Sequence, residues 1–265
     1  MAKQPNVAST QDSVSTYYDQ FGWLKDGEKS VEDIRFRTFP EGHDRYSKIV
    51  ADRTLATLAG RSGALVFVGG GDLPASHVSL AAQFQRVMCL DISQVALDIA
   101  KAKLGGAGEF MLQSIVDTDL PDGTADSVFS AHVVYHIDRD LQEAAIRQML
   151  RLTKAGGRVV VIYANPRSMF TLPGELIRRV KGRRAESTPQ LYYHAHPLGW
   201  WNRFKDSASI SLLPWEAVGS RMATSVLRTP AMARSFFRAA EAFERFAPAL
   251  AARMWHYPVI VLDKR

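Results

Sequence analysis

The chain has 265 residues, of which 46% are hydrophobic and 23% charged, and its formal net charge at pH 7 is +6. These proportions are typical of a globular protein and exclude a disordered or collagen-like chain, and no apolar stretch is long enough to span a bilayer. The single cysteine, Cys89, excludes an internal disulfide, and the polar start MAKQPNVASTQDS is unlike a secretory signal. We therefore expect a cytoplasmic protein.

The first forty residues predict an arm followed by a lid. Residues 1–14 are polar, and we expect an adaptable arm there. Residues 15–40 are too aromatic for a free tail and are expected to pack over another part of the molecule. Their aromatic residues are Tyr17, Tyr18, Phe21, Trp23, Phe36 and Phe39. Residues 44–60 then predict a helix that Gly60 ends.

From residue 64 the pattern alternates between strands and helices. Apolar runs predict strands at 65–68, 87–90, 109–112, 126–130 and 158–163. Helices are expected at 74–84, from the N-cap residue Ser93 to Gly105, and at 139–153. A tight turn at Ala155-Gly156-Gly157 is expected to lead into the last of these strands. The alternation predicts an α/β fold with a doubly wound, mostly parallel sheet that is covered on both faces.

Beyond residue 163 the rhythm loosens. Residues 164–206 combine proline, glycine, basic and aromatic residues, and we expect a cap that contributes to the substrate site. Strands are expected at 210–218 and 257–262, and a helical segment at 230–254 is expected to kink or split at Pro248.

The cap contains a basic cluster. Its members are Arg178, Arg179, Lys181, Arg183 and Arg184. Such a cluster can meet phosphate, nucleic acid or an anionic membrane surface, or it can be a solvated helix end. The sequence alone leaves these alternatives open.

Two expected strands end in residues that suit an adenosine-bearing cofactor. The first runs into Gly69, Gly70 and Gly71, where backbone amides can approach a ligand closely. The second ends in Asp91, twenty positions after Gly71, where a carboxylate can accept hydrogen bonds from ribose hydroxyls. The third glycine of a dinucleotide-binding turn is missing, and so is the Gly-Lys-Ser/Thr ending of a P-loop.

In order and spacing these features resemble the class I S-adenosylmethionine-dependent methyltransferases. The resemblance covers about residues 60–165 and includes Leu120-Pro121-Asp122-Gly123 and the stretch IRQMLRLTKAGGRVVVIY. It implies a Rossmann-like, mostly parallel seven-stranded sheet with an N-terminal lid and an insertion after the fifth strand. The implied division is an arm and lid (1–40), a cofactor-binding core (41–165), a substrate cap (166–208) and a C-terminal part that completes the sheet around a helical insertion (209–265).

The resemblance assigns S-adenosylmethionine as the cofactor. Asp91 corresponds to the carboxylate that holds the ribose hydroxyls, and Ile92 to the apolar residue against the adenine. Leu73 stands where the family has a third glycine, and Phe67 where it often has an acidic residue. The adenine contact is open among residues 114–117. The implied cofactor-binding residues are Gly69, Gly70, Gly71, Asp91, Ile92, Ser114, Ile115, Asp117, Ala131 and His132.

Residues after the fourth strand lie near the transferred methyl group in this family's fold. An imidazole has a suitable pKa for a base near neutrality, so His132 or His136 is a candidate base or acceptor-positioning residue, with a structural histidine as the alternative. Tyr18 is a further catalytic candidate, because Tyr17-Tyr18-Asp19 resembles the lid of small-molecule members. The candidate substrate residues are Tyr135, Asn165, Tyr193 and His194.

Two histidines in the cap, His194 and His196, have metal-like spacing. Without a third ligand in the sequence we expect no metal there, and a polar, aromatic substrate wall is the preferred interpretation.

We therefore expect methyl transfer to a small polar or phosphate-bearing metabolite, at an oxygen atom. Ser130-Ala131-His132 after the fourth strand disfavours methylation of a base amino group, so nucleic acid is not the expected partner. An RNA or ribonucleoprotein methyltransferase is one alternative, and a protein that uses the cofactor without methyl transfer is another. The Phe-rich helix at 236–246 leaves a homodimer open.

Overall fold

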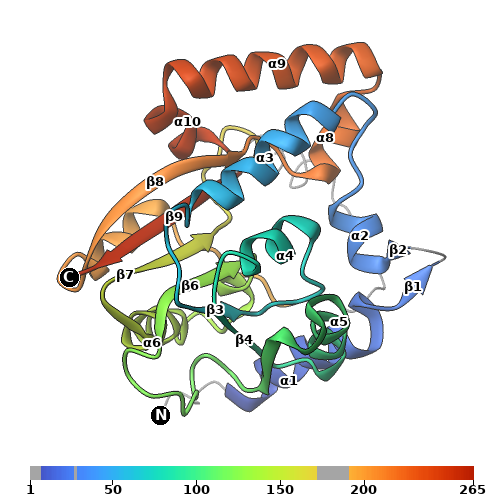
Figure 1. The fold of residues 1–265 in the computed structure, drawn as a ribbon. Coiled ribbons are helices and arrows are strands. Elements are labelled where there is room, and N and C mark those ends of the chain that lie inside the picture. The colour runs from blue at the N-terminus through green and yellow to red at the C-terminus, as the bar shows by residue number, and fades with distance from the viewer. Residues whose placement is uncertain (1–6, 27–28, 172–190) are drawn as a thin grey trace, which may run out of the picture.

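The computed structural model describes residues 7–26, 29–171 and 191–265. Its centre is a seven-stranded sheet of order β5-β4-β3-β6-β7-β9-β8 (Figure 1). The strands are β3 (Ala64–Val68), β4 (Arg86–Asp91), β5 (Gly108–Leu112), β6 (Ala125–Ala131), β7 (Thr153–Ile162), β8 (Ala208–Glu216) and β9 (Tyr257–Lys264). All neighbouring strands are parallel except at β9, which is antiparallel to β7 and to β8. The predicted doubly wound α/β fold is confirmed.

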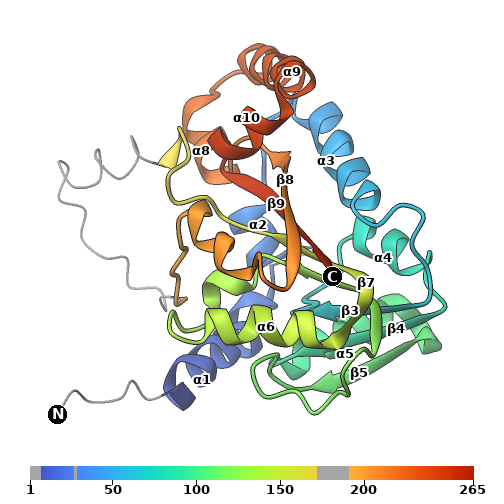
Figure 2. The same cartoon turned by 90° about the vertical axis from the view of Figure 1, so that its left-hand side faces the viewer.

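Helices cover both faces of the sheet, with α6 on one side and α4 on the other (Figure 2). The main helices are α1 (Val7–Tyr17), α2 (Val31–Phe36), α3 (Asp44–Ala56), α4 (Ala75–Ala81), α5 (Gln94–Leu104), α6 (Gln142–Leu152), α8 (Ser220–Val226), α9 (Pro230–Phe246) and α10 (Pro248–Met254). Shorter elements are a π-helical turn η1 (Tyr18–Gly22), the hairpin strands β1 (Lys25–Asp26) and β2 (Lys29–Ser30), and the 3₁₀ segments η2 (Gly105–Ala107), η3 (Val134–His136) and η4 (Leu198–Phe204).

Alternate side chains of β3 enter two separate cores, as the period of a strand requires. Val66 packs in one core with Ile146 of α6, whereas Phe67 packs in the other with Leu80 of α4. Every residue of β3 is buried, because the strand lies in the middle of a sheet that is covered on both sides. This rigid centre fixes the point at which β3 ends and the glycine turn begins.

A third core holds α3, α8, α9 and α10 together beyond the last strands. Pro248 separates α9 from α10, as expected, and Thr229 caps α9 by accepting a hydrogen bond from the amide of Met232 at 3.2 Å. This layer packs against the end of β8, next to the candidate active site.

The expected adaptable arm is wrong for residues 7–14, which are helical in α1. The helix is held by tertiary contacts that the local composition does not reveal. Val14 is buried, and the side-chain amide of Gln11 donates to Ser114. Ser15, on the same helix, donates to the carbonyl of Ile92 at 2.8 Å. Residues 7–14 therefore pack against the core together with the segment that the sequence predicts to be a lid.

The turn expected at Ala155-Gly156-Gly157 lies inside β7. The strand begins at Thr153, which pairs with Ala125, and the next pairs join Ser127 to Arg158. Gly156 has φ +72°, so the extra residues form an irregularity in the ladder and not a turn before it. Much of the expected cap, including the basic cluster at 178–184, lies outside the described residues.

Candidate active site

The glycine turn after β3 has the conformation that its sequence predicts. Gly69 has φ +65° and Gly71 has φ +54°, both in the left-handed region that favours glycine. A Cβ atom on Gly69 would overlap the side chain of Val133, which follows β6. Two strand ends therefore meet at this turn, and only a glycine backbone fits between them.

Leu73 keeps the backbone geometry of the glycine that it replaces. Its φ is +44°, one of two positive values among the described non-glycine residues, and its side chain is fully buried. Such a conformation is costly for leucine and persists only where the surroundings impose it. The other departure from the family pattern, Phe67, packs its ring against His77 and Phe129, so it supplies no polar group to the site.

Asp91 closes the turn from the end of β4. Its carboxylate accepts hydrogen bonds from the amide of Gly71 at 3.1 Å and from the amide of Ser93 at 3.0 Å. Burial raises the pKa of Asp91, and the nearby charge of Asp19 adds to this, while the amides oppose it. A carboxylate can accept about four hydrogen bonds, so acceptor capacity remains for a ribose.

The expected lid segment is hydrogen-bonded to the N-terminal end of α5. The hydroxyl of Ser93 donates to Asp19 at 2.5 Å and also accepts the amide of Ala96, which makes it the predicted N-cap of α5. Asp19 lies in η1, so the lid is tied to a residue two places after Asp91.

Aromatic rings of the lid lie on the glycine turn. The ring of Trp23 would be 3.3 Å from a Cβ atom on Gly71, and it stacks on Tyr18 with ring centres 5.5 Å apart. The indole nitrogen of Trp23 is buried without a hydrogen-bond partner among the described residues. Burial raises the pKa of Tyr18 well above its usual range, and the charges of Glu32 and Asp91 contribute. These rings can exclude water from a cofactor on the turn.

A second tie joins the lid to the glycine turn. The Arg37 guanidinium donates to both carboxylate oxygens of Asp72, at 2.6 and 2.8 Å. Burial opposes ionisation of Asp72, but the charge and hydrogen bonds of Arg37 outweigh it and lower the pKa of this carboxyl. An ion pair and close packing therefore both hold the glycine turn, which would carry the cofactor.

The segment after β5 contributes one buried apolar residue to this region. Ile115 is buried, and the Ser114 hydroxyl accepts hydrogen bonds from Gln11 and from the amide of Val116. Asp117 is exposed, although its amide is fixed by the carbonyl of Ser114 at 3.1 Å. The geometry therefore favours Ile115 over Asp117 as an adenine neighbour, and the assignment of this segment stays a prediction.

His132, the first residue after β6, is strained and partly buried. Its φ is +63°, and its Nδ1 atom lies 2.8 Å from the hydroxyl of Tyr135. Its ring meets Trp215 and Tyr257 edge to face, with centres 5.1 and 4.9 Å apart. Burial, helped by the charge of Arg37, lowers the pKa of His132 to about 3. A strained residue at this position is a frequent mark of a functional site.

His136 is held in one tautomer by the cap. Its Nδ1 atom lies 2.7 Å from the carbonyl oxygen of Tyr192, and because a carbonyl only accepts, Nδ1 carries the proton and Nε2 is the free acceptor. Burial lowers the pKa of His136 to about 4, which the carbonyl partly offsets. Its ring contacts Tyr135 and Tyr193 at 4.6 and 6.1 Å between centres. Both candidate histidines are therefore neutral near pH 7.

A carboxyl that the sequence analysis missed, Glu216, lies at the end of β8. Burial raises its pKa to about 8, and no described residue donates a hydrogen bond to it. The nearest basic atom is Nε2 of His43 at 3.8 Å, beyond hydrogen-bond range. Burial lowers the pKa of His43 to about 4, so the two groups are not an ion pair at neutral pH.

The backbone on both sides of Glu216 is clamped. Arg53 donates to the carbonyl of Trp215 at 2.8 Å, and the amide of Ala217 donates to the hydroxyl of Tyr46 at 3.1 Å. Arg53 and Tyr46 belong to a buried network around Glu244, which accepts a hydrogen bond of 2.5 Å from each of them. The neighbouring residues thus fix the backbone of a carboxyl that accepts no hydrogen bond from the described part of the chain, which is how a reactive group is positioned.

The topology brings Glu216 to the same edge as the glycine turn. β8 runs in the direction of β7, because both are antiparallel to β9, so the strands β3, β6 and β8 end together. Tyr257 lies between Glu216 and His132. Burial raises the pKa of Tyr257, and the charges of Glu216 and Tyr193 add to this. The ring of Tyr257 contacts the ring of His132 edge to face. A carboxylate two residues before the end of the strand expected at 210–218 was the signal that could have identified Glu216.

Two of the predicted substrate residues, Asn165 and His194, make contacts that differ from those of Tyr135 and Tyr193. Asn165 is buried, and its side chain donates to the carbonyls of Arg253 and Trp255 at 2.8 and 3.2 Å while accepting the amide of Arg167, which favours a structural role. His194 stacks edge to face with His196. Within the described ranges no group of three potential metal ligands is found.

Comparisons with known proteins agree with this geometry. Residues 68–161 match a family described as "Methyltransferase domain". A demethylmenaquinone methyltransferase from Clavibacter sepedonicus is 26% identical over 182 residues, which are 68% of this chain and 64% of that protein.

Two solved structures have the same fold. One is a geranyl diphosphate C-methyltransferase from Streptomyces coelicolor A3(2), with a TM-score of 0.60 and 16% identity over 98% of this chain and 100% of that one. The other is an N-methyltransferase from Bradyrhizobium japonicum WM9, with a TM-score of 0.56 and 11% identity over 96% and 98% of the two chains. At these identities the likeness concerns the fold.

Proposed function

We propose, from its membership of the class I S-adenosylmethionine-dependent methyltransferases, that this chain methylates a hydroxyl oxygen of a small metabolite. The reaction would take place in the cytoplasm, between the glycine turn and the ends of β6, β8 and β9. The observation that carries the choice of a hydroxyl is Glu216, a buried carboxyl to which no described residue donates a hydrogen bond and whose pKa is raised to about 8.

The cofactor half of the site suits S-adenosylmethionine. We propose that Asp91 accepts hydrogen bonds from the ribose, that Gly69, Gly70 and Gly71 allow the backbone to approach the ligand, and that Ile92 and Ile115 contact the adenine. When bound, the cofactor supplies an activated methyl group, so the protein's tasks are alignment and proton handling. Tyr18 and Trp23 would exclude water above the turn.

The acceptor half is aromatic apart from Glu216. We propose that the Glu216 carboxylate removes the proton from the acceptor hydroxyl as the oxygen–methyl bond forms. A carboxylate with a raised pKa is a stronger base than an ordinary one, and general bases of this kind contribute about 10²–10⁴-fold to a rate. His132 and Tyr257 would orient the acceptor, with Tyr135, Tyr193 and His194 as further wall residues. The neutral His132 and His136 suit positioning better than proton removal, because their pKa values are low.

The alternative acceptor atoms have different requirements. An amine needs less help from a base than a hydroxyl does, and the similar folds include both an N- and a C-methyltransferase, so the fold does not choose the atom. A nucleic-acid acceptor would depend on the basic cluster at 178–184, which lies outside the described residues.

The test is methyl transfer from labelled S-adenosylmethionine into a fractionated metabolite extract, with the labelled product identified by mass spectrometry. We expect an O-methylated product and an acid limb in kcat/KM with a pKa near 8. Glu216→Gln should remove the limb and lower kcat by about 10²–10⁴-fold, without weakening cofactor binding. Glu109→Gln is the control, since Glu109 is exposed at the opposite end of the sheet order, on β5. A labelled product methylated at nitrogen or carbon would contradict the proposal.

A further inference from the structure

The exposed side of α9 carries two large apolar side chains beside three arginines. α9 is the uppermost element of the fold in two perpendicular views (Figures 1 and 2). Its inner face packs through Ala233, Phe237 and Ala240. Its outer face carries Met232, which is 47% exposed, and Phe246, which is 89% exposed. A solvated helix presents polar residues on that side.

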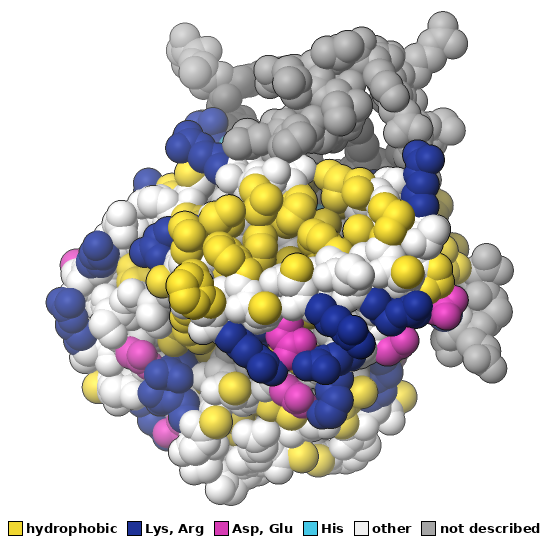
Figure 3. Space-filling view, turned by 90° about the horizontal axis from the view of Figure 1, so that it is seen from above, with side chains coloured by type: hydrophobic (Ala, Val, Ile, Leu, Met, Phe, Trp, Pro, Cys, Tyr) yellow, Lys and Arg dark blue, Asp and Glu magenta, His cyan; other side chains and the backbone are white. Residues whose placement is uncertain are grey.

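The apolar surface continues on the neighbouring helices. We use the name α9 face for the exposed residues Val226, Met232, Phe246 and Leu250, with the half-buried Phe236, Phe243 and Met254. Seen from above, hydrophobic side chains gather in one area of this side of the molecule (Figure 3). Exposed apolar patches of this kind mark interaction sites.

Arginines border the α9 face. Residues 220–254 contain six arginines, two glutamates and no other charged residue. Both glutamates, Glu241 and Glu244, have buried carboxylates that are ion-paired with arginines, so they expose little negative charge. Lys and Arg side chains, with Asp and Glu side chains between them, form a row beside the hydrophobic area (Figure 3).

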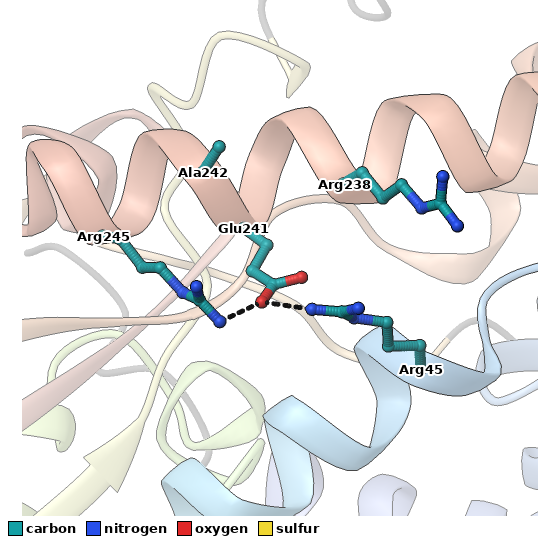
Figure 4. Close-up of a pocket in the computed structure, with 5 residues that line it drawn as sticks. All are labelled: Arg45, Arg238, Glu241, Ala242 and Arg245. Carbon is teal, nitrogen blue, oxygen red and sulfur yellow. Dashed lines mark hydrogen bonds and ion pairs between the residues drawn. The ribbon is translucent and has the colours of Figure 1, made fainter.

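Two of these arginines, Arg238 and Arg245, line an open pocket between α9 and α3 together with Arg45 of α3. Arg45 and Arg245 both donate to one oxygen of Glu241, while Arg238 lines the same pocket with its guanidinium directed away from Glu241 (Figure 4). No described residue forms an ion pair or hydrogen bond with Arg238. Three arginines line a pocket that contains one carboxylate, which leaves an excess of positive charge, and guanidinium groups suit phosphate oxygens.

We infer that the α9 face docks on the surface of an anionic lipid bilayer, with the apolar side chains in the interface and lipid phosphate at the pocket of Arg45, Arg238 and Arg245. Amphipathic surfaces bind membranes through buried apolar area together with attraction to anionic lipids, and both features are present on this one side. Among the described helices, none has the length and apolar character needed to cross a bilayer, so the association would be peripheral.

The charge distribution favours a bilayer over a second copy of the chain. Two copies joined through this face would bring their arginine borders together, and the acidic groups of the face are already neutralised within each copy. An anionic bilayer supplies the missing negative charge along the whole border. Phe246 also stands almost fully out of the surface, so it can enter the interface without rearrangement of the fold.

The experiment is co-sedimentation of the full chain with two kinds of vesicle. One kind is phosphatidylcholine alone, and the other contains about 30 mol% phosphatidylglycerol in addition. The principal variants are Phe246→Glu and Arg238→Glu, and their controls are Leu112→Glu and Lys101→Glu, which change exposed residues on β5 and α5. Circular dichroism and thermal melts check that each variant is folded. We expect binding to anionic vesicles only, reduced by salt and weakened at least about fivefold by either principal variant.

Each result has a defined meaning. Loss of binding in both principal variants and retention in both controls would support the docking surface. An absence of wild-type binding to anionic vesicles would overturn it, and so would binding that Phe246→Glu and Arg238→Glu leave unchanged, because the contact would then lie elsewhere. A concentration-dependent dimer in light scattering that Phe246→Glu abolishes would assign the face to a second copy and would likewise overturn it.

Discussion

The amide of Gly71 donates a hydrogen bond to the carboxylate of Asp91 at 3.1 Å, so the ends of β3 and β4 are joined directly. We expect Asp91→Ala to lower S-adenosylmethionine affinity by about 10- to 100-fold, because each hydrogen bond to a charged group contributes about 1.5–3 kcal/mol. Isothermal titration calorimetry measures the change. Asp98→Asn, on the exposed side of α5, is the control and should bind the cofactor normally. Equal affinity in Asp91→Ala and wild type would remove Asp91 from the cofactor site.

The raised pKa of Glu216 predicts how stability depends on pH. Its pKa is about 8 in the folded protein and near the ordinary value of 4.5 in the unfolded chain. The protonated form therefore stabilises the fold, an effect that is complete below about pH 4.5 and lost as the pH rises through 8. The difference amounts to about 3–5 kcal/mol.

A comparison with Glu216→Gln isolates this contribution. Urea unfolding at pH 5, 7 and 9 should show similar stabilities at pH 5 and an increasing advantage for the variant at pH 7 and 9, since glutamine cannot ionise. Glu109→Gln provides the reference for an exposed carboxyl. Parallel pH profiles for wild type and Glu216→Gln would mean that Glu216 ionises in the fold as easily as in the unfolded chain.

The cofactor side of the site could be predicted from the sequence because its signals are local. Gly69 and Gly71 need positive φ values, Ser93 caps α5, and Asp91 ends a strand, and each property belongs to a few consecutive residues. Leu73 shows the limit of such reasoning, since its left-handed backbone is imposed by the turn against the preference of the residue.

The acceptor side could not be read in the same way. Glu216 gains its properties from Arg53 and Tyr46, which are more than 160 positions away and hold its backbone, and from the burial of its side chain. The helical state of residues 7–14 also depends on distant partners, such as Ser114. Long-range packing decides both features, and no short motif encodes it.

The fit of Gly69 against Val133 predicts a coupled pair of mutations. Gly69→Ala should destabilise the fold by about 2–4 kcal/mol, because it combines a left-handed backbone with a steric overlap. Adding Val133→Ala should relieve the overlap but not the backbone strain, so the double variant should be more stable than the sum of the single effects predicts. Urea unfolding of the four proteins measures this coupling.

Alanine substitutions at two other glycines separate the contribution of backbone strain from that of steric overlap in the predicted destabilisation. Gly60 has φ +74° and open space around it, so Gly60→Ala reports backbone strain alone. Gly106 has open space and no positive φ, so Gly106→Ala should have little effect. If Gly69→Ala cost no more than Gly60→Ala, the predicted overlap with Val133 would be absent from the protein in solution.

His132 allows the role of its imidazole to be separated from the strain in its backbone. At φ +63° we expect the stability order His132→Gly and His132→Asn above His132→Ala, with a difference of about 1 kcal/mol, because glycine and asparagine tolerate the left-handed region. All three variants should keep the cofactor affinity of the wild type, raise the KM for the acceptor and retain the acid limb near pH 8, because Glu216 is the proposed base. Full turnover in the well-folded His132→Asn protein would show that the imidazole has only a structural function. A loss of the acid limb in that variant would instead make His132, and not Glu216, the group that controls proton removal.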